Sequence, residues 1–297
     1  LALTAALHTL TQESALRMVA WCHDLAWTNT QYQDELRDDY PWDLLKQEWP
    51  RTKYVTVSEP RRHELSTLLD IPPEHVRVVV PGVDVPRFLK WTPSAQHIVE
   101  SLRLLDADGI LLLPARLTRR KNIGLALRVL ADLRADGRDW RLVVTGPPGP
   151  HNPNNRGYLG ELLDQRAALG LEDAAHFVYA LGESQETPLV PDDDTMANLY
   201  QLADALFFPS TQEGFGIPLL EAGLVGLPIF CANIAPFHKT AGENARYFDP
   251  VTDSPQAIAD EVRAVLTDSK TARMRVRVRH QYRWERIIAE HIEPLIK

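Results

Sequence analysis

The chain of 297 residues contains little cysteine and no long apolar run. Its two cysteines, Cys22 and Cys231, do not form a metal-ligand spacing, and each follows an apolar stretch. We therefore expect both to be reduced core thiols of a cytoplasmic protein and not a disulfide. No apolar stretch approaches the roughly 20 residues that a membrane-spanning helix needs. The first ten residues lack the basic start and the cleavage site that are typical of a signal peptide.

The sequence also has a deficit of basic charge. There are 32 Lys and Arg residues against 40 Asp and Glu residues, which gives a formal net charge of −8. A nucleic-acid partner normally requires a basic face, so this balance argues against one. The 15 glycines and 22 prolines lie between apolar runs and do not cluster, which argues against a disordered chain. A chain of this length can hold one large globular domain or two ordinary ones.

From residue 110 onward, short apolar runs alternate with amphipathic stretches. The apolar runs predict strands over 110–115, 141–145, 175–179, 205–208 and 228–231. Helical patterns lie between them, near 122–136, 156–169, 194–203 and 217–225. Alternation at this spacing predicts parallel strands joined by right-handed crossovers, which together form a doubly wound α/β sheet.

Residues 1–90 show the same alternation with fewer strands. The sequence predicts a helix near 2–19, an amphipathic helix over HELSTLLD, and strands at MVAWCHD, KYVTVSE and VRVVVPG. Three strands do not complete a Rossmann-type domain, so we expect this domain to be incomplete and the chain to start inside it. Residues 85–108, which contain two prolines, are predicted to be a linker with one helix.

The most informative passage is 210–226, STQEGFGIPLLEAGLVG, which follows the predicted strand ALFF. Gly214 and Gly216 permit a tight turn with the backbone close to a ligand, and the next proline suits the first position of a helix. Glu213 would lie on the loop and Glu221 in the opening turns of the helix, so both carboxylates would border one cleft. Helix N-termini at strand carboxyl ends hold phosphates and sugars in open α/β sheets. Taken singly, the carboxylates are also consistent with simple helix-dipole partners.

The complete run closely resembles the Glu-x7-Glu signature of the retaining glycosyltransferases of family 4, also called glycosyl transferases group 1. This resemblance implies that the donor hexose lies beside Glu213 and that Glu221 holds the ribose hydroxyls. It also implies that the amides of Gly214, Phe215 and Gly216 face the donor sugar.

The resemblance further implies the α/β GT-B fold, with two Rossmann-like doubly wound domains. Residues 1–90 would form the acceptor-side domain and residues 91–270 the domain that binds the nucleotide sugar. Residues 271–297 would form a C-terminal helix that returns to the first domain.

A second motif lies in LLLPARLTRRKN, where Arg116 and Lys121 bracket a turn after a predicted strand. Two cations at the carboxyl edge of a sheet suit a diphosphate, whose negative charge grows as the sugar leaves. From the residues alone, a solvated basic loop is the slightly favoured interpretation, since Arg119 and Arg120 lie between them. The resemblance reverses this preference, because Arg-x4-Lys after the first strand of the second domain is the pyrophosphate clamp of the family.

Four further residues acquire roles through the resemblance. His23 matches the donor-facing histidine of the family, although a histidine at a strand end is more often structural. Asp24 would orient His23 or the backbone turn. Gly146 fits a glycine turn in the nucleotide domain, and the proline-rich insertion that follows it would shape a loop beside the donor. Tyr179, or else the neighbouring Ala180, would stack on or hydrogen-bond the base, with no preference between uracil and guanine.

Three charged or polar segments receive simpler interpretations. Ser58 is expected to cap a helix. In PDDDT (191–195), Asp194 or Thr195 is expected to cap the next helix, and no metal site is expected there. Residues 273–286 carry six arginines against Glu285. A solvated helix face is the plain interpretation of that segment, and peripheral contact with a membrane surface is the alternative.

The function implied by the resemblance is a retaining, metal-independent hexosyltransferase. It would move a hexose from a nucleotide-diphosphate sugar to an acceptor hydroxyl and would need no resident cofactor. Arg116 and Lys121 would stabilise the departing diphosphate, and Glu213 would either attack the sugar or only orient it. Two alternatives stay open: an inactive partner subunit that binds nucleotide sugars, and a sugar-nucleotide epimerase or phosphorylase of GT-B type. The sequence favours no particular donor, acceptor or oligomeric state.

Overall fold

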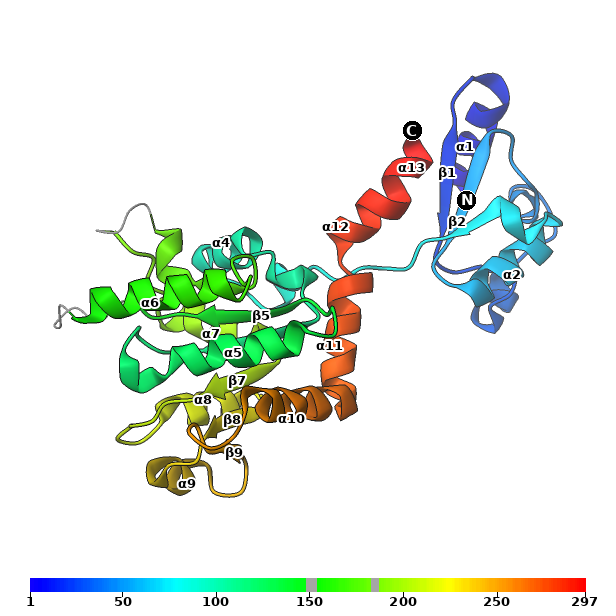
Figure 1. Ribbon diagram of the computed structural model, residues 1–297. Coiled ribbons are helices and arrows are strands. Elements are labelled where there is room, and N and C mark those ends of the chain that lie inside the picture. The colour runs from blue at the N-terminus through cyan, green and yellow to red at the C-terminus, as the bar shows by residue number, and fades with distance from the viewer. Residues whose placement is uncertain (148–153, 183–186) are drawn as a thin grey trace. The chain divides into compact units, whose positions relative to one another are not determined.

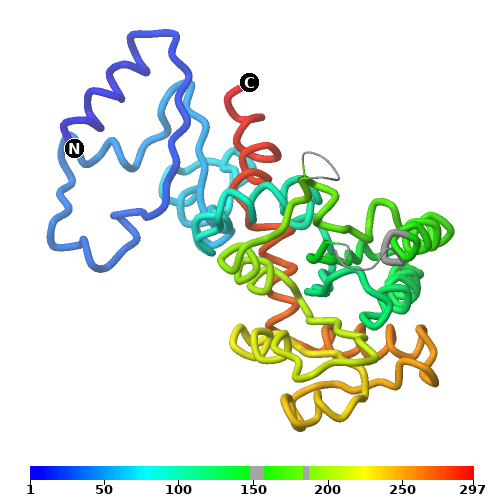
Figure 2. The backbone as a smooth tube through the Cα atoms, turned by 90° about the vertical axis from the view of Figure 1, so that its left-hand side faces the viewer, coloured from blue at the N-terminus to red at the C-terminus, as the bar shows by residue number. Residues whose placement is uncertain are grey.

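The computed structural model describes residues 1–147, 154–182 and 187–297. The chain forms two compact units, residues 1–84 with 281–297 (the first unit) and residues 85–280 (the second unit). Figure 1 shows a separate sheet in each unit, and every strand pair is parallel. Both ends of the chain belong to the first unit (Figure 2). The predicted α/β class with two parallel-sheet units is therefore confirmed.

The first unit contains a three-stranded sheet in the order β1-β2-β3. Its strands are β1 (Met18–Cys22), β2 (Thr52–Thr56) and β3 (Val76–Val78). Its helices are α1 (Ala2–Glu13), α2 (Glu59–Leu69), α12 (Trp284–Ile287) and α13 (Glu293–Ile296). It also has the 3-10 helices η1 (Thr30–Glu35), η2 (Asp43–Lys46) and η3 (Pro73–His75), and the π-helical segment η7 (Ile288–Ile292).

Two hydrophobic clusters cover the two faces of this small sheet. Residues of β1 alternate between them, since Ala20 and Cys22 pack in one cluster and Val19 and Trp21 in the other. The second cluster also contains residues from the C-terminal segment, so residues 281–297 complete the core of the first unit. Ser58 caps α2 as predicted, because its hydroxyl accepts a hydrogen bond from the amide of Arg61 at 3.4 Å.

The second unit contains a six-stranded sheet in the order β6-β5-β4-β7-β8-β9. Its strands are β4 (Gly109–Leu113), β5 (Trp140–Val144), β6 (Ala175–Phe177), β7 (Ala205–Phe208), β8 (Ile229–Ala232) and β9 (Arg246–Phe248). β7, β8 and β9 lie on one side of β4, and β5 and β6 lie on the other; Figure 1 labels β5 and, below it, β7, β8 and β9. This order gives a switch in winding direction between β4 and β7, where ligands bind in open α/β sheets.

Helices cover both faces of this sheet. They are α3 (Val85–Phe88), α4 (Pro93–Ser101), α5 (Ile123–Arg134), α6 (Asn154–Ala168), α7 (Asp193–Leu202), α8 (Ile217–Leu224), α9 (Ala235–Ala241), α10 (Pro255–Asp268) and α11 (Lys270–Gln281), with short turns η4 (Leu104–Asp106), η5 (Arg119–Lys121) and η6 (Val178–Leu181). α5 contacts α6 and α10, whereas α7 contacts α4 and α8. β4 and β5 are buried at every residue, as expected for a parallel sheet between two helical layers.

The five strands predicted in this half are confirmed to within two residues at each end, and β9, α9 and α10 were missed. The predicted helix near 2–19 is too long. α1 ends at Glu13, because Ser14 takes an extended conformation and its hydroxyl donates to the carbonyl of Leu10 at 2.5 Å. The cap of α7 is Asp192, not Asp194 or Thr195, since its carboxylate accepts from the amide of Thr195 at 2.8 Å.

The boundaries of the units differ from the predicted ones. The second unit begins at residue 85 and not at 91, and the segment expected to be a linker lies in it: Ile98 of α4 is fully buried in its core. At the other end, the second unit extends to residue 280 and not only to 270. α11 therefore belongs mainly to the second unit, and the returning segment starts at residue 281.

A buried ion pair explains why α11 stays with the second unit. Arg279 is 4% exposed, and its guanidinium donates to both oxygens of Asp204 at 2.7 and 3.0 Å. The same carboxylate accepts from the amide of Ile110 at 2.9 Å, which ties β4 to α11. Arg275 also turns inward and donates to the carbonyl of Gln201. The interpretation of the arginine-rich segment as a solvated face is therefore wrong at these two arginines.

We expect Asp204→Ala to destabilise the second unit by about 3–5 kcal/mol, because it leaves Arg279 buried without its counter-charge. Urea denaturation of the purified variant measures this loss. Asp164→Ala is the matched control, since Asp164 is exposed on α6, and its cost should stay within about 0.5 kcal/mol. Equal stability of the two variants would contradict the importance of the buried pair.

Candidate functional site

Two loops meet at the carboxyl edge of the second sheet. β4 and β7 are adjacent and parallel, so the segment after β4 and the segment after β7 leave the sheet side by side. They are joined through the backbone, because the amide of Thr211 donates to the carbonyl of Arg120 at 2.8 Å. The loop that contains Arg116 and Lys121 therefore lies against the loop that contains Glu213.

Three charged side chains meet where these loops touch. Lys121 and Glu213 form an ion pair, and their side chains are only 11% and 12% exposed. Arg120 approaches the other oxygen of Glu213 at 3.0 Å and also donates to the carbonyl of Gln212 at 3.0 Å. Both oxygens of this carboxylate are thus engaged by cations. We call Arg120, Lys121 and Glu213 the charge cluster.

Burial and pairing act in opposite directions on these groups. Partial burial would raise the pKa of Glu213, but the hydrogen bond and the positive charge of Lys121 outweigh it, and the pKa lies below the ordinary carboxyl value. Burial lowers the pKa of Lys121, and its contact with Glu213 offsets only part of that effect. Each partner therefore supports the charge of the other in a place where water is scarce.

Arg116 lies on the same loop but is exposed, and no ion pair to it is found among the described residues. A backbone contact places it beside the turn that follows β5. The amide of Gly146 donates to the carbonyl of Ala115 at 3.1 Å, and the amide of Leu117 donates to the carbonyl of Pro147 at 3.1 Å. The carboxyl ends of β4, β5 and β7 thus contribute to one region.

Gly146 is required by this close approach. A Cβ atom added there would lie 2.5 Å from the carbonyl oxygen of Ala115 and 2.6 Å from the amide nitrogen of Arg116. Both neighbours are backbone atoms, so neither can rotate away. The expectation of a glycine turn at this position therefore has a packing reason. The proline-rich insertion that follows lies partly at 148–153, outside the described residues.

The glycine-rich turn leads directly into α8. Gly216 is the N-cap residue of that helix and has a φ of +96°. A Cβ atom added there would lie 2.9 Å from the ring of Phe237. Gly214 has open space around it, and Phe215 is 55% exposed. The carbonyl of Phe215 accepts from the hydroxyl of Thr240 at 2.6 Å, which fixes the turn against α9.

Glu221 lies on α8, is exposed, and has a buried partner that the sequence analysis missed. The hydroxyl of Tyr200, on α7, donates to Oε2 of Glu221 at 2.5 Å, and Tyr200 is 3% exposed. Burial, together with the hydrogen bond and charge of Glu221, raises the pKa of this tyrosine. Tyr200 thus remains protonated and holds one oxygen of the carboxylate. The sequence did contain a signal for this contact, because a tyrosine on the apolar face of a predicted helix usually has a hydrogen-bond partner for its buried hydroxyl.

Three residues that the sequence analysis singled out lie on other segments. His23 belongs to the first unit, where it follows β1, is exposed and stacks on Trp21 with a centroid distance of 6.4 Å. Asp24 orients the backbone turn, because it accepts hydrogen bonds from the amide of Leu25 and the side chain of Asn29. Tyr179 lies in η6 after β6 and is half-buried against the core of the second unit.

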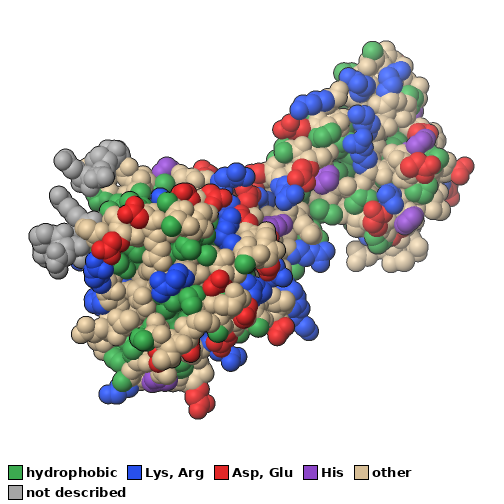
Figure 3. All heavy atoms as spheres, in the orientation of Figure 1, with side chains coloured by type: hydrophobic (Ala, Val, Ile, Leu, Met, Phe, Trp, Pro, Cys, Tyr) green, Lys and Arg blue, Asp and Glu red, His purple; other side chains and the backbone are tan. Residues whose placement is uncertain are grey.

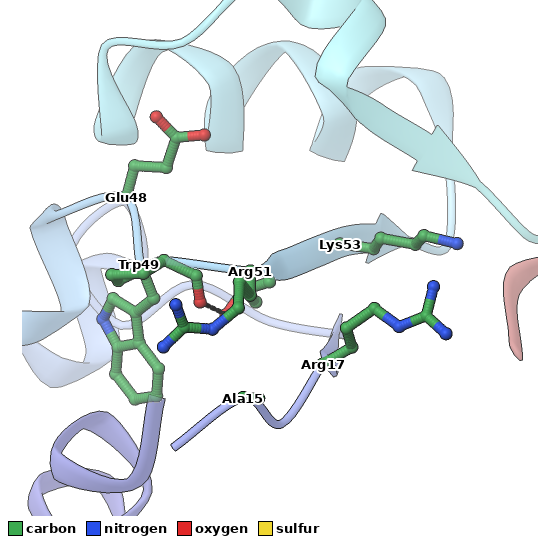
Figure 4. A pocket seen from close by; sticks show the side chains of 8 residues that line it. Ala15, Arg17, Glu48, Trp49, Arg51 and Lys53 are labelled. Carbon is green, nitrogen blue, oxygen red and sulfur yellow. Dashed lines mark hydrogen bonds between the residues drawn. The ribbon is translucent and has the colours of Figure 1, made fainter. Parts of the chain in front are cut away.

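The first unit has an open hollow of about 740 Å³ with basic side chains around it (Figure 4). Arg17 and Lys53 extend in the same direction there. Lys53 donates to the carbonyl of Leu295 at 2.8 Å, and Arg51 donates to the carbonyl of Thr11, so these two cations satisfy the last turns of α13 and α1. Helix capping therefore accounts for two of the basic side chains at this hollow.

Among residues 1–147, 154–182 and 187–297, no group of three His, Cys, Asp or Glu side chains converges as a set of metal ligands, and no helix has the length and apolarity to cross a bilayer. On the face of the second unit drawn in Figure 3, basic and acidic side chains are interspersed and form no single patch.

Comparison with known proteins identifies the family of the chain. A family model described as glycosyl transferases group 1 matches residues 95–281. An uncharacterized glycosyltransferase of Methanocaldococcus jannaschii is 25% identical over 240 residues, which cover 80% of this chain and 56% of that protein. A D-inositol 3-phosphate glycosyltransferase of Saccharomonospora viridis is 29% identical over 72% of this chain and 49% of its own length. The O-antigen chain mannosyltransferase B of Escherichia coli is 26% identical over 93% of this chain and 69% of its own length.

Among solved structures, Anabaena HepE in complex with UDP is similar at 18% identity, with a TM-score of 0.48, over 99% of this chain and 76% of that chain. The chain spans about half the length of the two glycosyltransferases named first above and of three further D-inositol 3-phosphate glycosyltransferases, between 43% and 56% of each. The matched family and the two parallel-sheet units agree with the GT-B fold that the sequence resemblance implied.

We expect Gly146→Ala to destabilise the second unit by about 1–3 kcal/mol, because the new methyl group would overlap backbone atoms of the Arg116 loop. Gly157→Ala is the matched control. Gly157 lies inside α6 with nothing within 4 Å of an added Cβ, so alanine should stabilise that helix by up to about 1 kcal/mol. Thermal unfolding of both variants measures the difference, and a lower midpoint for Gly157→Ala than for Gly146→Ala would contradict it.

Proposed function

Since the chain belongs to the glycosyl transferases group 1, we propose that it moves a hexose from a nucleotide-diphosphate sugar to an acceptor hydroxyl, with retention of configuration and without a metal ion. The observation that carries this proposal is the contact between the Arg116–Lys121 loop and the loop that leads from Glu213 to Glu221. Cations from one loop and carboxylates from the other are the groups that a sugar diphosphate requires at one place.

The diphosphate would bind to the cations of the first loop. Arg116 is exposed and offers a planar fork of donors, whereas Lys121 is a buried point charge. As the bond from the sugar to the diphosphate breaks, negative charge grows on the leaving oxygen, and fixed cations stabilise it more than they stabilise the bound donor. In this way the two cations would lower the barrier to departure of the nucleotide.

Glu213 would orient the hexose and would not attack it. A nucleophilic carboxylate needs a lone pair directed at the anomeric carbon, but both oxygens of Glu213 face cations. Its lowered pKa also makes it a weak nucleophile. A front-face departure and attack, in which Glu213 positions the sugar, fits this charge cluster better than a double displacement.

Glu221 would hold the ribose of the donor. Tyr200 occupies one of its oxygens, which leaves Oε1 to accept hydrogen bonds from ribose hydroxyls. The first unit would bind the acceptor, with His23 near the reacting end of the sugar. An inactive subunit that binds nucleotide sugars without transfer is the second candidate, and turnover measurements separate the two.

The first test is binding of nucleoside diphosphates and their sugars, with UDP-glucose, GDP-mannose and ADP-glucose as the panel. We expect one nucleotide to raise the unfolding midpoint, because a ligand that binds only the folded state stabilises it. Arg116→Ala should weaken the binding of that nucleotide about 10- to 100-fold, the range that loss of a charged hydrogen bond produces. Titration calorimetry measures the loss.

Arg119→Ala is the matched control for Arg116→Ala. Arg119 lies on the same loop, but its guanidinium pairs with Glu161 at 2.5 Å on the exposed side of α6. Its loss should leave nucleotide binding within about twofold of the unmodified chain, since an exposed pair contributes little. Equal losses in the two variants would argue against a diphosphate site at Arg116. Binding without transfer or hydrolysis in the full-length protein would favour the inactive subunit.

Tyr200→Phe tests the role assigned to Glu221. The variant keeps the buried ring but removes the hydroxyl that fixes the carboxylate, so we expect nucleotide affinity to fall about 5- to 20-fold. The analogue of the same nucleotide that lacks the ribose 2′- and 3′-hydroxyls should bind the variant and the unmodified chain equally. An equal loss of affinity for both ligands would mean that Tyr200 serves only the packing of α7.

A further inference from the structure

The first unit contains an apolar cavity that the proposed donor site does not use. Its volume is about 240 Å³, and its lining includes Cys22, Trp27, Trp49, Tyr54 and Leu68. The lining comes from β1, from β2, from the segment between these strands, and from α2. All of these residues lie within the first unit.

The wall of this cavity is part of the hydrophobic core. Leu25, Tyr54, Leu65 and Leu69 each line it and are each less than 9% exposed. Burial raises the pKa of the Cys22 thiol, so this side of the wall is neutral as well. Protein interiors are normally close-packed, and side chains beside a void lose dispersion contacts on that side. An apolar hollow of this size therefore favours an apolar occupant.

The size of the cavity indicates the kind of group that it would hold. An engineered apolar cavity of about 150 Å³ in another protein stays dry and binds benzene. The cavity in this chain is larger, so an aromatic ring or a compact branched aliphatic group would fit. Larger fused ring systems or a long extended chain would exceed it.

Polar groups accompany the apolar wall. Asp24 lines the cavity and is the second residue after β1, at the carboxyl edge of the first sheet. Trp27 also lines it, and its indole N–H is buried without an acceptor in the part of the chain that the structure describes. An unpaired buried donor costs free energy, and a ligand oxygen would satisfy it. The lining therefore suits a molecule with an apolar body and hydroxyl or ether oxygens.

We infer that this cavity binds the apolar part of the acceptor, an aryl or compact aliphatic group attached to the hydroxyl-bearing portion. The inference rests on the proposed function in one respect, because it assigns the acceptor to the first unit. The hydroxyl-bearing portion would extend to the carboxyl edge of β1, where His23 and Asp24 follow the strand. The cavity thus selects acceptors by their apolar group and leaves the donor to the second unit.

The test compares phenyl β-D-glucopyranoside with methyl β-D-glucopyranoside by titration calorimetry on the whole chain. The two probes differ only in the apolar group. We expect the phenyl compound to bind at least about tenfold more tightly, since burial of an aromatic ring contributes at least that factor. Its binding should also show the more negative heat-capacity change that accompanies burial of apolar surface. Equal affinities of the two glucosides would overturn the inference.

Ala26→Phe tests whether the cavity is the place of binding. Ala26 lines the cavity, and a phenylalanine ring there would fill it, so the preference for the phenyl glucoside should disappear. Ala6→Phe, the same change at an exposed position of α1, is the matched control and should keep the tenfold preference. If Ala26→Phe does not fold, Leu45→Trp fills the cavity from η2. A folded filling variant that retains the full preference would overturn the inference.

Nucleotide binding in the same samples separates this inference from the proposed function. Ala26→Phe should bind the donor nucleotide as the unmodified chain does, because the substitution lies in the other unit. Absence of nucleotide binding in the unmodified chain would count against the proposed function alone. A preference for the phenyl glucoside that persists in the folded filling variants would count against the cavity alone.

Discussion

The buried pairing of Lys121 with Glu213 is the contact on which the rest of the site depends. It joins the loops that follow β4 and β7, and Arg120 reinforces it from the exposed side. Neither ion can lie at so dry a position without the other, because removal of one partner leaves an uncompensated charge at a cost of several kcal/mol. The parallel sheet supplies the geometry, since it brings the carboxyl ends of neighbouring strands to one edge.

This pairing also bears on how a donor would enter. The carboxylate of Glu213 neutralises part of the positive charge to which a diphosphate would bind. A bound diphosphate would share Lys121 and Arg120 with Glu213, which would stay paired while it meets the sugar hydroxyls. Arg116 is exposed and unpaired among the described residues, so it would offer the first contact to the incoming anion. Pre-paired cations of this kind need little reorganisation when charge develops in the transition state.

Periodicity and local motifs predicted most of the second unit and brought Lys121 and Glu213 to the same edge. They did not predict Tyr200 beside Glu221 or Asp204 beside Arg279. Those pairs join residues 21 and 75 positions apart, and no local pattern specifies which polar side chains meet across packed helices. The same limit explains the misplaced boundaries. Pro86 and Pro93 suggested a linker, but the burial of Ile98 that attaches α4 to the second core is a tertiary effect.

The two carboxylates of the signature passage meet different partners, which gives them different chemistry. Glu213 faces two cations and so carries little uncompensated charge, whereas Glu221 faces the neutral hydroxyl of Tyr200 and keeps an oxygen free. A carboxylate that is already neutralised suits a position beside a sugar whose ring becomes positive only when its leaving group departs. A carboxylate with a free oxygen suits hydroxyls that must be held before and after that step. One short segment can thus supply two acids with separate tasks, because environment and not residue type assigns the role.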